Sequence, residues 1–135
     1  MKRIAIATLA LAATAACAAS PYDEPYSIIT IDRIKTADYH MLPVFVNRVD
    51  GQNSVERNKH VVPPGNHEVV LDLAPRGGFH LPTQQTIALT TEPCVRYNMA
   101  AIVENSISQE WRPVIRSTEP IGECAAKFKL TASAK

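Results

Sequence analysis

Three cysteines stand at positions 17, 94 and 124, and their chemistry depends on whether the protein is exported. Cysteines of exported proteins pair as disulfides, whereas those in reducing compartments stay free. We expect Cys94 and Cys124 to form one disulfide bond, with two free thiols as the alternative. Closing a loop of about 30 residues would stabilise the fold by roughly 3–4 kcal/mol. Cys17 then has no cysteine left to pair with, so a different role is expected for it.

The N-terminus has the order of features found in an export signal. Lys2 and Arg3 precede an uncharged, Ala- and Leu-rich run over residues 4–16. The run is too short to cross a bilayer as a helix and suits the apolar core of a signal peptide. Thr14-Ala15-Ala16 then leads into Cys17, which resembles the lipobox of bacterial lipoproteins, with Thr14 where Leu is usual. The resemblance implies that residues 1–16 are removed and that Cys17 carries the lipid anchor.

The same resemblance implies a location. Ala18 follows the lipidated cysteine where an Asp would favour the inner membrane, so we expect the periplasmic face of the outer membrane. Residues 17–25, with two prolines, would form an extended tether about 25 Å long. The alternative is cleavage after Ala15 or Ala18, which would leave a soluble periplasmic or secreted protein.

The histidines make a weaker case for a metal site. His60, His67 and His80 lie beside turn residues, and imidazole nitrogen is a common zinc ligand. Their spacing is not that of a zinc motif, so a site would require the loops to converge, and solvated histidines are the simpler interpretation. His67-Glu68 begins a near match to the zinc-protease helix motif, but the second histidine is missing. No nucleophile elbow or phosphate loop is present either. We assign no catalytic residue, metal ligand or cofactor.

Four other residues could bind a partner. Trp111 is the single tryptophan, and Arg96, Arg112 and Arg116 should share the outer face of one hairpin if its strands alternate regularly. If exposed, these side chains would offer a ring and three cations to an acidic protein or to anionic lipid headgroups. The competing interpretation packs Trp111 in the core and leaves the arginines as a solvated face.

Composition places these residues in one globular domain. Removing residues 1–16 leaves 119 of 135, enough for a single modest core. The apolar fraction of 46% is ordinary for a folded domain, and ten prolines argue against an all-α fold. The net charge of +1 becomes −1 once Lys2 and Arg3 are removed, and no Lys/Arg run remains, so nucleic acid is not an expected partner.

Alternating apolar and polar residues predict about seven short strands, hence an all-β antiparallel sandwich over residues 26–128, with a small barrel as the alternative. Residues 129–135 would be a frayed tail. The strand candidates cover residues 26–34, 42–49, 67–73, 84–92, 95–103 and 111–116, with a further short strand near 128–130. The pair 95–103 and 111–116 forms a hairpin that the disulfide closes.

Local signals refine this prediction. Asp50-Gly51 predicts a type I′ hairpin turn, and residues 63–66, Pro-Pro-Gly-Asn, predict a type II turn. Residues 52–59 could be an exposed edge strand or a loop. Residues 42–49 have apolar side chains on both faces, with Val46 on one and Val49 on the other, which predicts a central strand.

Two segments resemble known bacterial families. The first is VFVNRVDG followed by VVPPGNHEVVLDL, which resembles the PEGA-type β domains of bacterial surface proteins. The second contains EPCVRYNMAA, ENSISQEWRPVI and EPIGEC, and is similar to small uncharacterised lipoproteins of Gram-negative bacteria. The resemblance implies a β fold and an envelope location, and it carries over no catalytic residue.

From these observations we expect a non-enzymatic cell-envelope lipoprotein. It would be anchored through lipid, palmitate included, and would bind or scaffold another envelope component. The alternative is a small periplasmic hydrolase or metal-binding protein with a site at the loop ends.

Overall fold

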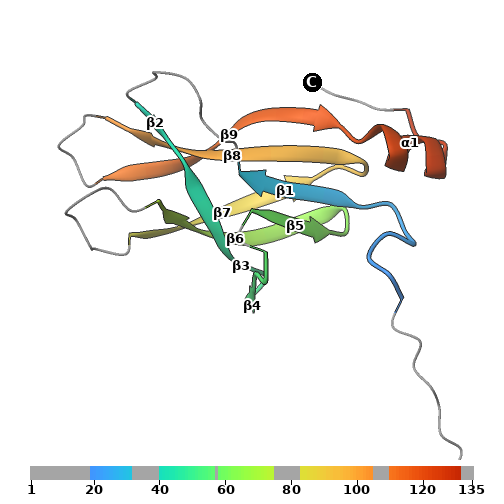
Figure 1. The fold of residues 1–135 in the computed structure, drawn as a ribbon, viewed down its shortest axis with the longest axis horizontal. Coiled ribbons are helices and arrows are strands. Elements are labelled where there is room, and N and C mark those ends of the chain that lie inside the picture. Colours follow the sequence, from blue (N-terminus) through green and yellow to red (C-terminus); the bar gives the residue numbers. More distant parts are fainter. Residues whose placement is uncertain (1–18, 32–39, 57, 75–82, 105–109, 132–135) are drawn as a thin grey trace, which may run out of the picture.

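The computed structural model describes residues 19–31, 40–56, 58–74, 83–104 and 110–131. Two β-sheets pack against each other, and one short helix lies at the end of the molecule from which the N-terminal segment leaves (Figure 1). The prediction of an all-β sandwich is confirmed.

Nine strands are distributed over the two sheets within these residues. The first sheet contains β1 (Ser27–Ile31), β2 (Met41–Leu42), β5 (Lys59–Val62), β8 (Val95–Val103) and β9 (Trp111–Pro120). The second contains β4 (Gln52–Asn53), β3 (Val44–Val49), β6 (Gly65–Leu73) and β7 (Gln84–Thr91), in that order across the sheet.

Strand β8 is the centre of the first sheet. β9 pairs antiparallel with it along its length, as the hairpin prediction required. On the other edge, β1 pairs in parallel with residues 96–99, and β2 pairs antiparallel with residues 101–102. The parallel pair departs from the fully antiparallel sandwich that we expected. It forms because β1 and β8 start at the same end, where the Tyr26 carbonyl accepts a hydrogen bond from the Cys94 N–H at 2.8 Å.

Prolines mark three of the points where the chain passes from one sheet to the other. Pro43 separates β2 from β3, Pro63 and Pro64 separate β5 from β6, and Pro93 separates β7 from β8. Proline has no N–H for a strand ladder, so pairing stops there and the chain can turn to the facing sheet. The expected type II turn at 63–66 is such a corner, not a hairpin turn. Gly65 has a φ of 142°, far from the value near 80° of a type II turn.

The Asp50-Gly51 turn is confirmed. Both residues have positive φ, 50° and 77°, as a type I′ turn demands, and they join β3 to β4. Beyond the turn, residues 52–59 contain both of the alternatives that we left open. Strand β4 is an exposed edge strand of two residues, and a connection then leads to Lys59 at the start of β5.

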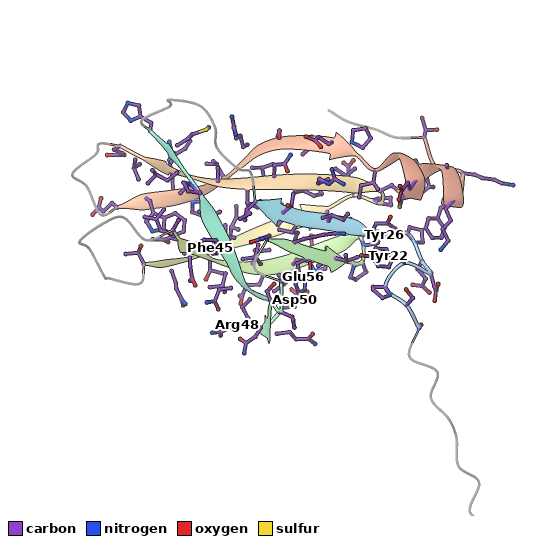
Figure 2. All side chains as sticks on the ribbon, in the orientation of Figure 1. Tyr22, Tyr26, Phe45, Arg48, Asp50 and Glu56 are labelled. Atoms are coloured by element: carbon purple, nitrogen blue, oxygen red, sulfur yellow. A yellow bond between two sulfur atoms is a disulfide. The ribbon has the colours of Figure 1, made fainter. Side chains whose placement is uncertain are left out.

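A β-bulge in β3 sets which side chains enter the core. The register with β6 skips Asn47, between Val46 and Arg48. Regular alternation would point Arg48 inward and Val49 outward. With the bulge, Val49 is 3% exposed, and Arg48 projects from the outside of the molecule (Figure 2). The expectation that Val49 faces away from Val46 was therefore wrong. The central position is confirmed, because β3 lies between β4 and β6, although its neighbour β4 has only two residues.

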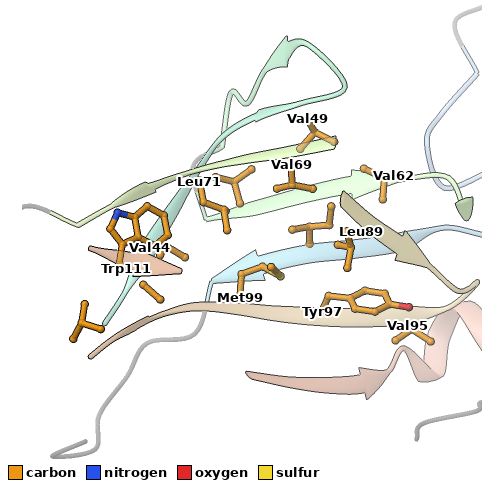
Figure 3. Close-up of a cluster of buried hydrophobic side chains, with 14 residues drawn as sticks. Val44, Val49, Val62, Val69, Leu71, Leu89, Val95, Tyr97, Met99 and Trp111 are labelled. Carbon is orange, nitrogen blue, oxygen red and sulfur yellow. The ribbon is translucent and has the colours of Figure 1, made fainter. Parts of the chain in front are cut away.

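One hydrophobic core fills the space between the sheets (Figure 3). Full burial of each Val or Leu side chain contributes about 1.5–3 kcal/mol relative to its exposure. The buried members are Ile29, Val44, Val46, Val49, Val62, Val69, Leu71, Leu89, Val95, Tyr97, Met99, Ala101, Val103 and Trp111.

The C-terminal segment forms helix α1 (Gly122–Phe128), so the expected strand near 128–130 was wrong. Two consecutive alanines favour helix, and Glu123 in the first turn and Lys127 in the last complement the helix dipole. Lys129 ends the helix in the left-handed conformation, with φ of 52°. Among the described residues no helix is long and apolar enough to cross a membrane.

Helix α1 covers a second apolar cluster on the outer side of the first sheet. Cys124 lies in this cluster and is joined to Cys94 by the predicted disulfide, with the Cα atoms 5.3 Å apart. The buried members are Tyr26, Ile28, Cys94, Ile121 and Cys124, and Val61, Ala125 and Phe128 pack against them. Neither cysteine belongs to the main core, so the disulfide acts on the helix and on the sheet end beneath it.

We predict that reducing the disulfide lowers the free energy of unfolding by about 3–4 kcal/mol, because the unfolded chain regains the freedom of the open loop. Urea unfolding with and without reductant measures this change. Hydrogen exchange should accelerate first in Gly122–Phe128, while Val69 and Leu71 of β6 stay protected. Unchanged unfolding midpoints, or equal loss of protection in both regions, would contradict the prediction.

Candidate functional site

A groove of about 410 Å³ opens on the outer face of the first sheet, beside α1. Ile28 lies in its floor and points away from the main core, which its neighbour Ile29 enters. The lining comes from the N-terminal segment, three strands of the sheet and the helix. It consists of Tyr22, Tyr26, Ile28, Lys59, Arg96, Ile121, Glu123 and Lys127.

Two tyrosines form the aromatic part of the groove. Tyr22 and Tyr26 meet edge to face, with ring centroids 5.0 Å apart and an interplanar angle of 88°. Both lie at the same end of the molecule (Figure 2). Tyr26 is 7% exposed, whereas Tyr22 is 39% exposed. The buried ring therefore anchors the accessible one, which is free to contact a ligand.

Three cations line the groove together with these tyrosines. The Lys59 Nζ lies 5.9 Å from the centroid of the Tyr22 ring, and the Lys127 Nζ donates a hydrogen bond to the Tyr22 carbonyl at 2.6 Å. Arg96 pairs with Glu119 of β9 at 3.5 Å, and both side chains are about half exposed. Ammonium groups carry three donors each, so the two lysines keep N–H groups for a further acceptor.

The groove can therefore bind an anion that has apolar surface beside it. Glu123 is the one acidic residue among those that line it, against Lys59, Arg96 and Lys127. The chemistry offered is charge and aromatic contact, with the floor closed by Ile28 and Ile121.

The residues expected to bind a partner do not gather at one site. The strand register places Arg96 opposite Glu119 and Arg112 opposite Ile102, on one face but roughly 20 Å apart along β8. Arg116 is the extra residue of a second bulge, where the register passes directly from Ser117 to Ile115. The structure thus brings only Arg96 into the groove.

Trp111 packs in the main core and is 5% exposed (Figure 3). The core interpretation of this residue fits its position, and its ring is not presented to a partner. Its Nε1–H has no hydrogen-bond partner in the part of the chain that the structure describes. An unpaired buried donor of this kind costs about 1–3 kcal/mol.

The N-terminal segment is folded against the domain. Residues 20–23 form a turn in which the Asp23 N–H donates to the Ser20 carbonyl and the Asp23 carboxylate accepts from the Ser20 N–H, at 3.0 and 2.9 Å. Tyr22 then contacts Tyr26, Lys59 and Lys127. The expected extended tether over 17–25 is wrong for its described part from Ser20 onward. Cys17 and residues 1–16 lie outside the described residues.

The sequence held one overlooked signal for this groove. Two tyrosines four residues apart are unusual in a segment read as a solvated tether, and they could have indicated packing. Lys59, Glu123 and Lys127 had no such signal, because only the tertiary fold brings them together.

His67 has a structural role. It lies in β6 and is 7% exposed, with Nδ1 2.7 Å from Asp50 Oδ2 and Nε2 2.7 Å from the Pro63 carbonyl oxygen. Both neighbours are acceptors, so a ring nitrogen that carries a hydrogen donates to the acceptor beside it. The ring ties the β3–β4 turn to the corner between β5 and β6. A metal ion would have to displace one of these two bonds.

The Asp50 carboxylate is held by two donors. The hydrogen bond from His67 and the backbone N–H of Glu68, 2.9 Å from Oδ1, keep the pKa of Asp50 below its usual value. Burial lowers the pKa of His60, although the negative charge of Asp50 opposes this shift. His60 is 3.2 Å from the Ser54 hydroxyl, but it is His67 that contacts Asp50, so these residues do not form a catalytic triad.

The histidine metal site that we considered is not assembled in the described residues. Within them, no group of three or more His, Cys, Asp or Glu side chains could hold a metal ion. His80, the third member of that hypothetical site, lies outside the described residues.

Comparison with known proteins does not add a relative. No protein-family model, curated protein or solved structure matches the chain.

We predict that Trp111 emits at short wavelength and resists quenching by acrylamide, because its ring is enclosed by the core. Urea-unfolded protein, measured in parallel, should show the red-shifted and readily quenched emission of a solvated indole. Native emission that is already red-shifted and quenched would contradict this position of the ring.

We also predict that Asp50 contributes stability that is lost in acid. Its pKa is lower in the folded than in the unfolded state, so the unfolded state binds more protons and stability falls as pH drops from about 4 through the folded pKa. Asp50→Asn should flatten this acid limb in urea unfolding between pH 2 and pH 5. Glu56→Gln, which removes an exposed carboxylate, is the control. A limb unaltered by Asp50→Asn would refute the assignment.

Proposed function

We propose that this protein is a non-enzymatic lipoprotein of the cell envelope, which is anchored through Cys17 and binds its partner at the groove beside α1. The proposal rests mainly on how the three cysteines are paired. Cys94 and Cys124 are joined to each other, which leaves Cys17 as the odd cysteine, directly after the small residues that end the apolar N-terminal run.

The geometry of the domain supports a binding role. The groove offers exposed cations and an accessible tyrosine on a rigid base, which suits recognition of an anionic partner. The best acid–base pair of the described residues, Asp50 and His67, uses its hydrogen bonds to hold two loops together. We therefore favour binding or scaffolding over the alternative of a periplasmic hydrolase or metal-binding protein.

The anchor is tested by growing expressing cells with radiolabelled palmitate. Label should enter the protein, and Cys17→Ala should abolish incorporation, because the acyl groups of a bacterial lipoprotein are attached to that residue. Cys94→Ala and Cys124→Ala are matched controls that remove a cysteine without touching the anchor, and they should keep the label. Equal labelling of wild type and Cys17→Ala would sink the proposal.

The location of the protein is measured in the same cells. Separation of the inner and outer membranes on a density gradient should place the labelled protein in the outer-membrane fraction. Recovery of the wild-type protein in the soluble periplasmic fraction would instead favour ordinary signal cleavage.

A further inference from the structure

We propose that the groove faces the membrane that carries the anchor and binds the phosphate groups of anionic phospholipids in it. This inference rests on the proposed lipid anchor at Cys17 and adds to it an orientation and a ligand. The anchor alone would tether the domain without orienting it.

The first argument is the length of chain between the anchor and the groove. Tyr22, which lines the groove, is five residues from Cys17. Five residues span at most about 18 Å even when fully extended. The headgroup layer itself is about 5–8 Å thick on each side of a bilayer. Because Ser20 to Asp23 form a turn that is attached to the domain, this short stretch of chain keeps Tyr22 within about 18 Å of the anchor.

The second argument is charge. The groove lining carries Lys59, Arg96 and Lys127 against Glu123. Glu119 neutralises Arg96 from outside the lining, so the two lysines provide most of the attraction for an anion. Each lysine near an anionic surface strengthens binding by about fivefold. The phosphate groups of a membrane surface are separate from one another, so each of the two lysines can contact a different one.

The third argument is the pair of tyrosines. Tyrosine is enriched where proteins meet the membrane interface, because its ring contacts apolar chain and its hydroxyl stays hydrated. Tyr22 is accessible and sits between Lys59 and Lys127, through contacts of its ring and of its carbonyl respectively. Aromatic surface and cations are thus presented together at the point where the chain leaves for the anchor.

The test uses the processed protein that carries palmitate, inserted in vesicles of phosphatidylcholine alone or with about one third phosphatidylglycerol. A water-soluble acylating reagent labels lysine amines, and mass spectrometry measures the rate at each residue. We expect Lys59 and Lys127 to react about fivefold more slowly in the anionic vesicles. Lys129, which is exposed but does not line the groove, corrects for the general effect of an anionic surface. Molar salt should remove the protection.

Two charge-reversal variants distinguish binding at the groove from a general effect of surface charge. Lys127→Glu should release Lys59 from protection, whereas Arg48→Glu on the other sheet should leave it unchanged. If Lys59, Lys127 and Lys129 slow equally in palmitate-carrying protein, the orientation is refuted and the anchor stands. If an acidic decapeptide protects the two lysines in detergent and anionic vesicles do not, the groove binds protein instead. Protein without palmitate would overturn both proposals.

Discussion

The architecture depends on what Cys94 holds together. Its N–H donates to the Tyr26 carbonyl at the start of β1, its carbonyl accepts from the Ile121 N–H at the end of β9, and its sulfur is bonded to Cys124 of α1. One residue therefore fixes the first strand, the last strand and the helix at the same end of the sandwich. It does so at a φ of 60°, in the corner where the chain returns from the second sheet. Without this junction the groove would lose its helical wall.

The two ends of the described chain meet at this junction. Tyr22 and Lys127 lie 105 residues apart in the sequence and are joined by a hydrogen bond. The N-terminal turn, the helix and the outer face of the first sheet thus form one surface, while the main core lies on the opposite side of that sheet. This separation lets the residues of that surface vary without disturbing the packing that stabilises the sandwich. It also explains why the disulfide belongs to the smaller apolar cluster.

Alternation of residue types predicted the strands well where the ladder is regular, as in β6, where Val69 and Leu71 face the core. The Asp50-Gly51 turn was predictable because few residues accept positive φ twice in succession. The bulges at Asn47 and Arg116 were not, since they depend on the register with a neighbouring strand. Each bulge reverses which side of the sheet the following residues face, and for this reason Val49 faces the core. Helix α1 was missed because seven residues carry too short a pattern. The groove was missed because its lining comes from four stretches of the chain that only the fold brings together.

The observed disulfide and the proposed lipid anchor together assign all three cysteines. Mass spectrometry of unreduced peptides from protein isolated from the cell envelope measures all three in one experiment. We expect a peptide pair joined through Cys94 and Cys124, together with an N-terminal peptide that begins at Cys17 and carries the mass of acyl chains. Free thiols at positions 94 and 124, a disulfide that includes Cys17, or an unmodified peptide that still contains residues 1–16 would contradict this assignment.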